Sequence, residues 1–547
     1  MLRRSAERFP DKTAIIGAGL GATVAVGGQV PGRLTYRELD SEANRFAHAL
    51  LATGAAAQTK VAILSRNLPH YGVVFFGAAR SGLVLVNVSI QYAPAELEYV
   101  LNKADAEILI VDAQFEAKAH AVLARCPKLR TVVRIDAPVV VPPAQAGATG
   151  AASAPGAAMK PAPPPAGVRC VDFAAFLAGQ PATAPDVILT EDMPFCMTYT
   201  GGTTGRPKGV LCTHRAREVT AHTVVVEEAL DERDVVAIVT PLFHVAALNI
   251  MFQPAMLVGA SCVFLAPWSV DGFVRACAEH RITAAFMVPT QANMLVSQEG
   301  VDMAALASWR KLSFAGAPMP DWVQRALKDR LPALQLTQIY GQSEVGVLTS
   351  LRDWYLPGKL GSIGRQAFNV DVRLFRTDGR EAGVGEPGEI ASRGDNLMRE
   401  YYNEPEQTAA VFRLGDGWLL TGDVGVRDAD GFITLIDRAK DMLISGGENV
   451  YPKVIEDVIY SLDEVAECAV FGIPDPKWGE VPAAYVALKP GARIEAEVII
   501  ARCQQRLAEF KRPRVVKIVA DFPKTPIGKI QKNLLREPYW AGQQRKI

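Results

Sequence analysis

Short apolar runs alternate with helical patterns through the first part of the chain. Apolar residues recur at three- and four-residue steps in segment 35–51, which is typical of a helix with one buried face. Residues 60–65 then form an apolar run that predicts a strand. The same alternation continues through residues 71–81, 83–87, 94–102 and 108–112. Because these predicted strands are apolar at successive positions, they favour a largely parallel sheet covered by helices on both faces.

Three later apolar runs predict strand ends, and small or turn-forming residues follow the second and third of them. They close at His244, Val288 and Phe314. In open parallel sheets, ligands bind beyond the carboxyl ends of the strands, so these strand ends indicate one shared site. A helix is expected to begin near Ala246 and to be interrupted by Pro254.

The pattern changes near residue 361 to short segments separated by turns, which predicts a small β unit over about 361–438. Residues 439–547 alternate strands and helices again and predict a compact α/β domain. Residues 137–167 are rich in proline, alanine and glycine, and we interpret them as a surface insertion unrelated to chemistry. The predicted fold class is α/β, with a large N-terminal domain over 1–438, which holds parallel-rich sheets and the β unit, and a small C-terminal domain over 439–547.

Length and charge narrow the class of partner. A chain of 547 residues is too long for one core and should divide into at least two domains. Lysine plus arginine and aspartate plus glutamate number 58 each, so no overall field attracts nucleic acid or an anionic membrane. The expected partners are small molecules, and the composition leaves a homodimer open.

The cysteines, the N-terminus and the apolar stretches indicate in which cellular compartment the protein is expected. Eight cysteines show no C-x-x-C pair and no zinc spacing, and the N-terminus lacks the apolar core of a secretory signal, so we expect a reduced cytoplasmic protein. Residues 235–270 contain no Asp, Glu, Lys or Arg, but prolines, His244 and polar amides interrupt them. We therefore expect a buried α/β core there and no membrane span.

The stretch 199–210 has the composition of a phosphate-binding loop. Glycines let backbone N–H groups approach an anion, threonine hydroxyls add donors, and Lys208 supplies a point charge. The spacing is not that of the common NTPase loop, because Gly209 follows the lysine and Val210 to Cys212 predict a strand. The alternative is a flexible surface loop. The candidate ligands of phosphate are Thr200, Gly201, Gly202, Thr203, Thr204, Gly205 and Lys208.

This loop resembles the signature of the adenylate-forming enzymes, the superfamily of acyl-CoA synthetases, luciferases and peptide-synthetase adenylation domains. The family usually has serine where this chain has Gly201, so one hydroxyl donor is absent. Motifs along nearly the whole chain share the resemblance. It implies a substrate role for ATP and a small C-terminal domain that is mobile.

A second motif, residues 340–344, is similar to the family's Tyr-Gly-x-Thr-Glu. The resemblance implies that Tyr340 packs on adenine, that Ser343 bonds the α-phosphate, and that Glu344 with Thr200 lies on the Mg²⁺ side. Mg²⁺ prefers hard oxygens and one or two carboxylates beside substrate phosphates. Without the family, Tyr340 would be read as a core aromatic and Glu344 as a solvated charge. Gly341 and Gln342 complete the nucleotide-binding motif.

Three further segments resemble nucleotide-binding and catalytic motifs. The resemblance implies that Gly316, Ala317 and Pro318 lie along the adenine, and that Asp423 accepts hydrogen bonds from the ribose with Arg438 beside it. A carboxylate accepts two hydrogen bonds at once, which suits a ribose. Lys529, in segment 524–530, is implied to bridge the substrate carboxylate and the α-phosphate.

His244 matches a histidine that acyl-CoA synthetases carry between the acyl pocket and the thiol tunnel. A satisfied core histidine is the alternative. The absence of a carboxylate here argues against an α-amino acid, since a buried ammonium needs a paired charge. Val345 and Gly346 are the other implied acyl-pocket residues.

The resemblance also implies a thioester step with coenzyme A. Lys440 matches the hinge about which the C-terminal domain rotates, and this rotation exchanges Lys529 for a glycine-rich loop. The implied CoA contacts are Gly446, Gly447, Glu448, Trp478, Phe510, Arg512 and Arg514. Core packing for Trp478 and a solvated basic face for the arginines are the alternatives.

Together these observations predict an acid–thiol ligase that uses ATP, Mg²⁺ and coenzyme A. The expected acid is apolar, either a fatty acid, with medium chain length favoured, or an aromatic acid. The alternative is an adenylating enzyme that loads a carrier-protein phosphopantetheine. A nucleotide-binding regulator without turnover is a rival of another class, and the intact Lys529, Glu344 and Lys208 speak against it.

Overall fold

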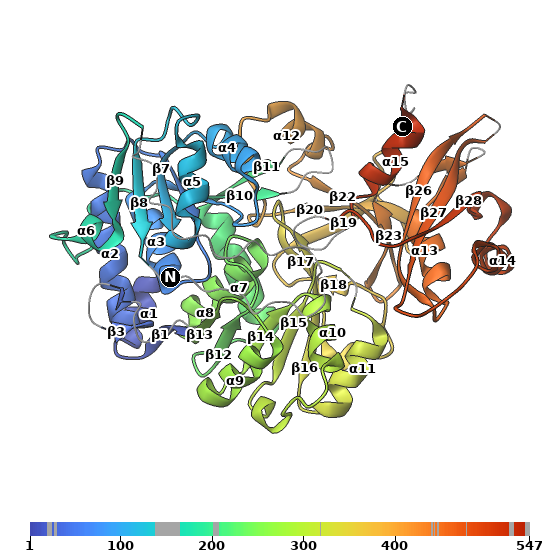
Figure 1. The fold of residues 1–547 in the computed structure, drawn as a ribbon, viewed down its shortest axis with the longest axis horizontal. Coiled ribbons are helices and arrows are strands. Elements are labelled where there is room, and N and C mark those ends of the chain that lie inside the picture. Colours follow the sequence, from blue (N-terminus) through green and yellow to red (C-terminus); the bar gives the residue numbers. More distant parts are fainter. Residues whose placement is uncertain are drawn as a thin grey trace. The chain divides into compact units, whose positions relative to one another are not determined.

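A computed structural model (Figure 1) describes residues 1–18, 25–26, 30–136, 165–200, 207–317, 319–438, 441, 443–445, 448–476, 478–524 and 530–541. The chain folds into two compact units. The first comprises Met1–Thr200, Pro207–Asp371 and Arg393–Ala410, and the second contains Val372–Ser392 and Val411–Ile547. None of the described helices is both long enough and apolar enough to cross a membrane.

An eight-stranded sheet holds the phosphate-loop strands of the first unit. Its order is β21-β11-β10-β6-β5-β7-β8-β9, and all neighbours from β10 to β9 pair in parallel. Only β11 and β21 at one edge run antiparallel. The strands are β5 Lys60–Leu64, β6 Val84–Asn87, β7 Ala106–Asp112, β8 Thr131–Ile135, β9 Arg169–Asp172, β10 Pro194–Thr200, β11 Lys208–Thr213 and β21 Glu400–Tyr401.

A nine-stranded sheet forms the other half of this unit. Its order is β18-β17-β16-β15-β14-β12-β13-β1-β4, with a parallel centre and antiparallel edges. The strands are β1 Thr13–Ala18, β4 Arg33–Thr35, β12 Val235–Ile238, β13 Ser261–Leu265, β14 Ala284–Met287, β15 Lys311–Phe314, β16 Gln335–Gln342, β17 Gly346–Leu351 and β18 Arg365–Gln366. The predicted parallel-rich α/β architecture is thus confirmed, and its parallel strands are divided between two sheets.

Two helices lie between the sheets. Helix α3 (Pro69–Ser81) is buried along almost all its length and contacts β6 of one sheet and β1 of the other. Helix α7 (His214–Glu228) likewise contacts β10 and β11 on one side and β17 on the other. Thr213 caps the start of α7 by accepting the N–H of Ala216 at 3.1 Å.

The other helices of the first unit follow the predicted β/α alternation. Helix α2 begins with a capping box, in which Thr35 and Glu38 satisfy each other's backbone N–H groups. The helices are α1 Leu2–Arg8, α2 Tyr36–Ala52, α4 Pro94–Lys103, α5 Glu116–Leu123, α6 Phe173–Leu177, α8 Gln253–Val258, α9 Val270–His280, α10 Pro289–Ser297, α11 Asp321–Arg330 and α12 Pro405–Val411.

The helix predicted to begin near Ala246 does so, but Pro254 does not interrupt it. The chain forms a π-helix, η2, over Ala246–Phe252 and continues directly into α8. Pro254 lies in the first turn of α8, where its missing N–H is tolerated. The prediction of a break was therefore wrong because the proline falls at a helix start.

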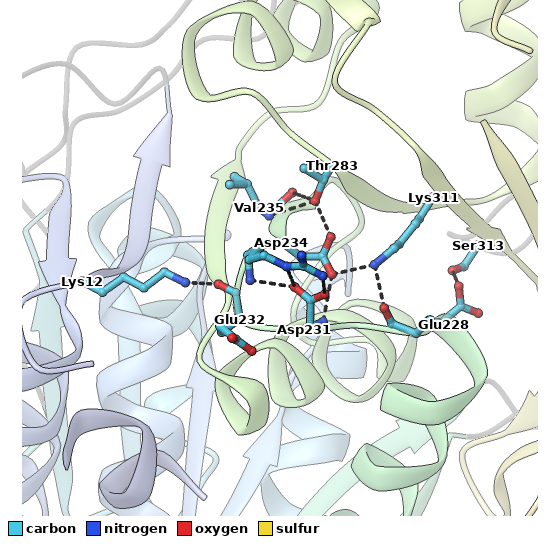
Figure 2. Close-up of polar contacts among 11 residues, drawn as sticks. Lys12, Glu228, Asp231, Glu232, Asp234, Val235, Thr283, Lys311 and Ser313 are labelled. Carbon is cyan, nitrogen blue, oxygen red and sulfur yellow. Dashed lines mark hydrogen bonds and ion pairs between the residues drawn. The ribbon is translucent and has the colours of Figure 1, made fainter. Parts of the chain in front are cut away.

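A polar network ties the amino ends of three strands of the nine-stranded sheet together (Figure 2). Asp234 accepts the Thr283 hydroxyl at 2.7 Å and the Lys311 ammonium at 2.7 Å. Thr283 in turn accepts the N–H of Val235 at 2.9 Å. These contacts lie at the start of β12, β14 and β15, so the edge opposite the predicted site is fixed by buried hydrogen bonds.

The second unit contains the predicted small β unit and the C-terminal α/β domain. Strands β19 Asp371–Phe375, β20 Pro387–Arg393, β22 Leu419–Arg427 and β23 Ile433–Arg438 form one sheet, in which β20, β22 and β23 pair antiparallel. The later elements are β24 Leu443–Ser445, β25 Glu448–Val450, α13 Pro452–Tyr460, β26 Val465–Asp475, β27 Gly479–Leu488, α14 Ala496–Arg506, β28 Val515–Val519 and α15 Lys532–Trp540. The predicted boundary between residues 438 and 439 stays a prediction, and residues 137–164 of the insertion lie outside the described residues.

Candidate active site

Two phosphate-loop candidates, Thr200 and Lys208, lie on the paired strands β10 and β11. Strands β10 and β11 pair antiparallel, and Thr200 stands opposite Lys208. Gly201 to Gly205 lie outside the described residues, so their contacts stay predictions. A Cβ on Gly209 would lie 2.8 Å from the Met197 sulfur, which explains the glycine after Lys208. The strand predicted after the lysine is confirmed as β11, whereas the NTPase loop has a helix at this point.

Tyr401 connects two residues that the sequence predicted separately. It pairs with Val210 across β21 and β11. The Lys208 ammonium lies 5.0 Å from the centroid of the Tyr401 ring. The Tyr401 hydroxyl donates to Glu344 Oε1 at 2.8 Å. Burial raises the pKa of Tyr401, and the nearby Glu344 charge adds to this, so the phenol remains a hydrogen-bond donor.

The motif 340–344 covers the last three residues of β16 and the first two of the turn that leads to β17. A bulge falls between Tyr340 and Gly341, and a Cβ on Gly341 would lie 1.9 Å from the Gly346 carbonyl oxygen. Glycine is therefore required at that position. The carbonyl of Glu344 accepts the N–H of Met398 at 2.7 Å. A segment far along the chain thus fixes the turn that carries Glu344, Ser343 and Gln342.

The adenine candidates occupy a neighbouring strand end. β15 pairs in parallel with β16, and Phe314 stands opposite Gln338. Gly316, two residues past the end of β15, has φ of +87° and is exposed, as is Ala317. Gly316, just past the end of β15, is therefore level with Tyr340 on the adjacent strand β16. Pro318 lies outside the described residues.

The acyl-pocket candidates include a close contact between a turn and a helix. Gly346 has φ of +64°, and a Cβ there would lie 2.6 Å from the hydroxyl of Thr220 on α7. Val345 is buried, and its carbonyl accepts the Asn396 amide at 2.6 Å. Thr220 was not among the predicted residues, because on sequence it is one polar position of a helix.

His244 lies six residues after Ile238, the last residue of β12, and its ring is neutral. Its Nδ1 accepts the N–H of Ala246 at 3.2 Å, so the ring proton lies on Nε2. Burial lowers the pKa of His244. The ring is therefore oriented by the first turn of η2 and presents an N–H group at Nε2.

In the second unit, strand register brings the two ribose candidates together, and their role stays a prediction. Asp423 is 8 % exposed and stands directly opposite Arg438 in the β22–β23 pair. The Thr421 hydroxyl accepts the N–H of Asp423 at 3.2 Å and donates to the Ile390 carbonyl at 2.8 Å. The backbone around Asp423 is thus held in place within its own sheet.

The C-terminal candidates fall partly outside the described residues, which exclude Lys440, Gly446, Gly447 and Lys529. Lys524 and Ile530 form a β-bridge, and Lys524 pairs with Glu467 at 2.7 Å. This bridge brings together the two ends of the segment that contains Lys529.

The CoA candidates in this domain have contacts of their own. Trp478 donates its backbone N–H to Asp475 at 2.8 Å, and Phe510 packs against the domain core. Arg512 donates to the Leu507 carbonyl at 3.0 Å, and Arg514 pairs with Glu509 at 3.6 Å. Glu448 stands opposite Ser445 in the β24–β25 pair. A role for any of them in CoA binding stays a prediction.

The fit of Mg²⁺ follows from the oxygen donors. Glu344 offers a carboxylate and Thr200 a hydroxyl, which are the hard ligands that Mg²⁺ prefers. In the part of the chain that the structure describes, no cluster of three His, Cys, Asp or Glu side chains could hold a metal ion. Glu344 and Thr200 fit an Mg²⁺ ion that phosphate oxygens and water also coordinate, and this role stays a prediction.

Two sheets enclosing helices, the glycine-rich hairpin and a separate small C-terminal domain define an adenylate-forming enzyme. A model of the AMP-binding enzyme family matches residues 2–402, and a model of the AMP-binding enzyme C-terminal domain matches residues 454–529. The chain belongs to the AMP-binding enzyme family.

Similar proteins support the same class. A feruloyl-CoA synthase of Amycolatopsis sp. is 36% identical over 92% of this chain and 94% of its own length. An indoleacetate–CoA ligase of Aromatoleum aromaticum is 31% identical over 92% and 93%. The solved structure of a fatty acyl CoA synthetase of Mycobacterium tuberculosis has a TM-score of 0.73 at 30% identity, covering 99% of this chain and 98% of that one. The predicted enzyme class, an AMP-forming acid–thiol ligase, is confirmed.

Proposed function

We propose that this protein joins an apolar carboxylic acid to coenzyme A through an acyl-adenylate. In the first step a carboxylate oxygen attacks the α-phosphorus of ATP and pyrophosphate leaves. In the second step the thiol sulfur attacks the acyl carbon, and AMP leaves. The acid is a fatty acid, of medium chain length, or an aromatic acid.

The observation that carries this proposal is the contact chain from Lys208 through Tyr401 to Glu344. A cation placed at a phosphate loop and a carboxylate suited to Mg²⁺ are held by one aromatic side chain at 5.0 Å and 2.8 Å. Lys208 begins strand β11 and Glu344 lies in a turn, and the Tyr401 side chain contacts both. Such fixed charges suit a leaving pyrophosphate.

Other residues orient the reactants. Lys208 and the loop N–H groups hold the β- and γ-phosphates, and Ser343 donates to the α-phosphate. Asp423 accepts the ribose hydroxyls. The Lys529 ammonium offsets the charge that grows between the carboxylate and the α-phosphate. When bound, Mg²⁺ neutralises charge on the triphosphate.

The second step needs a different set of residues. Rotation of the C-terminal domain about Lys440 withdraws Lys529 and brings the segment around Gly446 to the acyl-adenylate. His244, neutral with its proton on Nε2, lies between the acyl group and the thiol path. It donates a hydrogen bond there and does not act as the base in this tautomer.

The nature of the acid follows from the residues around His244. The uncharged stretch 235–270 forms β12, η2, α8 and β13, and most of its side chains are buried. The feruloyl, indoleacetyl and fatty acyl groups after which these relatives are named all contain an apolar carbon skeleton. This supports the same kind of acid here.

The test is pyrophosphate release over a panel of carboxylic acids, with and without coenzyme A. We expect release with some acids alone and acyl-CoA formation when the thiol is added. Release without any acyl-CoA, together with transfer to a phosphopantetheinylated carrier protein, would instead identify a carrier-loading enzyme. Absence of release with every acid would contradict the proposal.

A further inference from the structure

A cavity of about 650 Å³ lies at the amino edge of the nine-stranded sheet, where β12, β14 and β15 begin. We call it the amino-edge cavity. Its volume is within the range of about 300–1,000 Å³ that is typical of small-molecule sites. Every ionisable side chain that lines it is basic. The lining residues are Arg233, Val235, His280, Arg281, Thr283 and Arg310.

The order of the strands brings the three arginines of this lining together. Strands β15, β14 and β12 are parallel neighbours in the sheet. Arg310 directly precedes β15, Arg281 lies three residues before β14, and Arg233 lies two residues before β12. Because neighbouring strands are about 4.8 Å apart, the starts of these three strands lie within about 10 Å along the sheet edge. Arginines that are distant in sequence therefore surround one cavity.

Among the described residues, two of these three guanidinium groups have no carboxylate partner. Arg233 pairs with Asp231, whereas Arg281 and Arg310 form no ion pair with a described side chain. Both are exposed, so a ligand can reach them from solvent. Like charges around one cavity repel one another, and an anion that enters is attracted by all of them. The cavity thus has the electrostatics of an anion site.

The buried carboxylate behind the cavity does not compensate these arginines. Asp234 accepts the Thr283 hydroxyl and the Lys311 ammonium, each at 2.7 Å (Figure 2). Lys311 also donates to the Ala229 carbonyl at 2.7 Å. The Asp234 charge is therefore balanced by Lys311. The same hydrogen bonds fix the starts of β12, β14 and β15, so the wall of the cavity is ordered before a ligand binds.

The end of helix α9 accounts for only part of the positive charge. Arg281 caps this helix with φ of +52°, a conformation that glycine and asparagine adopt more readily than arginine. His280 and Arg281 both lie at the helix C-terminus, where basic side chains are favourable. The carbonyl groups there supply about half an elementary charge, which is too little to neutralise Arg281 and Arg310 together.

We propose that the amino-edge cavity binds a polyphosphate, as a free inorganic anion or as the phosphate chain of a nucleotide. A guanidinium group donates two parallel N–H bonds to phosphate oxygens, and several phosphates in a row match several arginines. The balanced charge of the whole chain and the limited volume of the cavity favour a small anion over a nucleic acid. The cavity is separate from the proposed ligase site, so the inference does not rest on that function.

The test measures binding of inorganic tripolyphosphate to the full-length protein by isothermal titration calorimetry without Mg²⁺. All variants carry Lys208→Ala, which weakens binding at the predicted phosphate loop. We expect the Lys208→Ala protein to bind tripolyphosphate. Adding Arg281→Gln and Arg310→Gln should weaken this binding about a hundredfold, because each hydrogen-bonding group of full charge contributes about tenfold. Tripolyphosphate should also raise the Tm of the Lys208→Ala protein and not that of the triple variant.

Two further substitutions in the same background separate the cavity from charge in general. Arg325→Gln removes an exposed arginine of α11 that does not line the cavity, and it should change the affinity less than about twofold. Arg310→Lys keeps the charge but loses the bidentate geometry, so it should weaken binding about tenfold. Because Arg281 and Arg310 are exposed, the Tm without ligand should be the same in every variant. If the triple variant does not fold, Arg310→Lys provides the comparison.

ATP distinguishes the two sources of the phosphates. Equal affinity for ATP and tripolyphosphate would support recognition of the phosphates alone, and tighter binding of ATP would support a nucleotide. Equal affinity of the triple variant and the Lys208→Ala protein for both ligands would overturn the proposal. Equal competition by sulfate at the same ionic strength would also overturn it, because sulfate lacks the row of phosphates. None of these measurements requires an acid or turnover, so they test the cavity independently of the ligase function.

Discussion

At the scale of single residues, the hydroxyl of Tyr401 is the most direct test of the proposed phosphate site. Tyr401→Phe keeps the ring near Lys208 but removes the hydrogen bond to Glu344. A hydrogen bond to a charged group contributes about 1.5–3 kcal/mol, so we expect kcat/KM for pyrophosphate release to fall about tenfold or more. The measurement is the rate of pyrophosphate release as a function of Mg²⁺ concentration.

The adjacent tyrosine provides a matched control. The Tyr402 hydroxyl donates to Asp105 at 3.0 Å, outside the predicted site. Tyr402→Phe removes the same atom and should leave pyrophosphate release within about twofold. Equal losses in both variants would show that the Tyr401 contact matters for folding and not for catalysis.

The sequence located the charged residues but not the residues that hold them. Lys208 and Glu344 stand in compact motifs whose composition indicates phosphate and metal chemistry. Tyr401 carries no motif, and its contact depends on the pairing of β11 with β21, which are far apart in sequence. Thr220, which lies against Gly346, has no sequence motif either, and only the packing of α7 between two sheets places it there.

At the scale of elements, the last turn of α7 contains two adjacent glutamates, Glu227 and Glu228, of which only Glu227 pairs with an arginine. Glu228 accepts the Ser313 hydroxyl at 2.5 Å (Figure 2), and its Oε1 is buried without a partner. Burial raises the pKa of Glu228 to about 8. Between about pH 4.5 and pH 8 the folded state therefore retains a proton that the unfolded state has released.

The stability that Glu228 contributes must then fall as pH rises through that window. Glu228→Gln removes the titration. The free energy of unfolding of the variant, relative to wild type, should therefore rise by about 1–3 kcal/mol as pH increases from 5 to 8. Thermal unfolding at pH 5 and at pH 8 measures this change. The Tm of the variant should exceed that of the wild-type protein at pH 8 only. A Tm difference that does not change with pH would contradict the assignment.

Glu227 is the control for the same chemical change. Its carboxylate pairs with Arg352 at 3.2 Å and accepts the Ser350 hydroxyl at 2.5 Å. Glu227→Gln breaks the ion pair and leaves Arg352 with less compensation, so it should lower the Tm at both pH values. The two substitutions are thus expected to act in opposite directions at pH 8.

The periodic pattern predicted the elements well where packing and propensity agree. The strands near 60–65 and 108–112 and the helix at 35–51 fall close to β5, β7 and α2. The division into two sheets was not predictable, because it depends on long-range pairing such as β1 with β13. The π-helix at Ala246 was also missed, since no local signal distinguishes π from α geometry there.

At the scale of the whole molecule, the proposal divides the reaction between two arrangements of the C-terminal domain. Family motifs around residues 340–344 and 524–530 suggested this division, and the matches over residues 2–402 and 454–529 support the family assignment. No periodic pattern encodes a rotation, because the same elements persist in both arrangements. Only separate measurement of the two half-reactions distinguishes two arrangements from one.

Lys529→Ala is the substitution that separates them. If Lys529 acts only in the first step, the variant should lose acyl-adenylate formation by about a hundredfold or more, the scale for removing one preorganised charge-stabilising group. It should still convert supplied acyl-AMP and coenzyme A to acyl-CoA at nearly the wild-type rate. Lys524→Ala is the matched control, because Lys524 lies in the same segment but pairs with Glu467 at 2.7 Å.

Lys440→Pro should show the reverse bias, with the second step slowed more than the first. Equal loss of both steps in Lys529→Ala would exclude the two-arrangement mechanism.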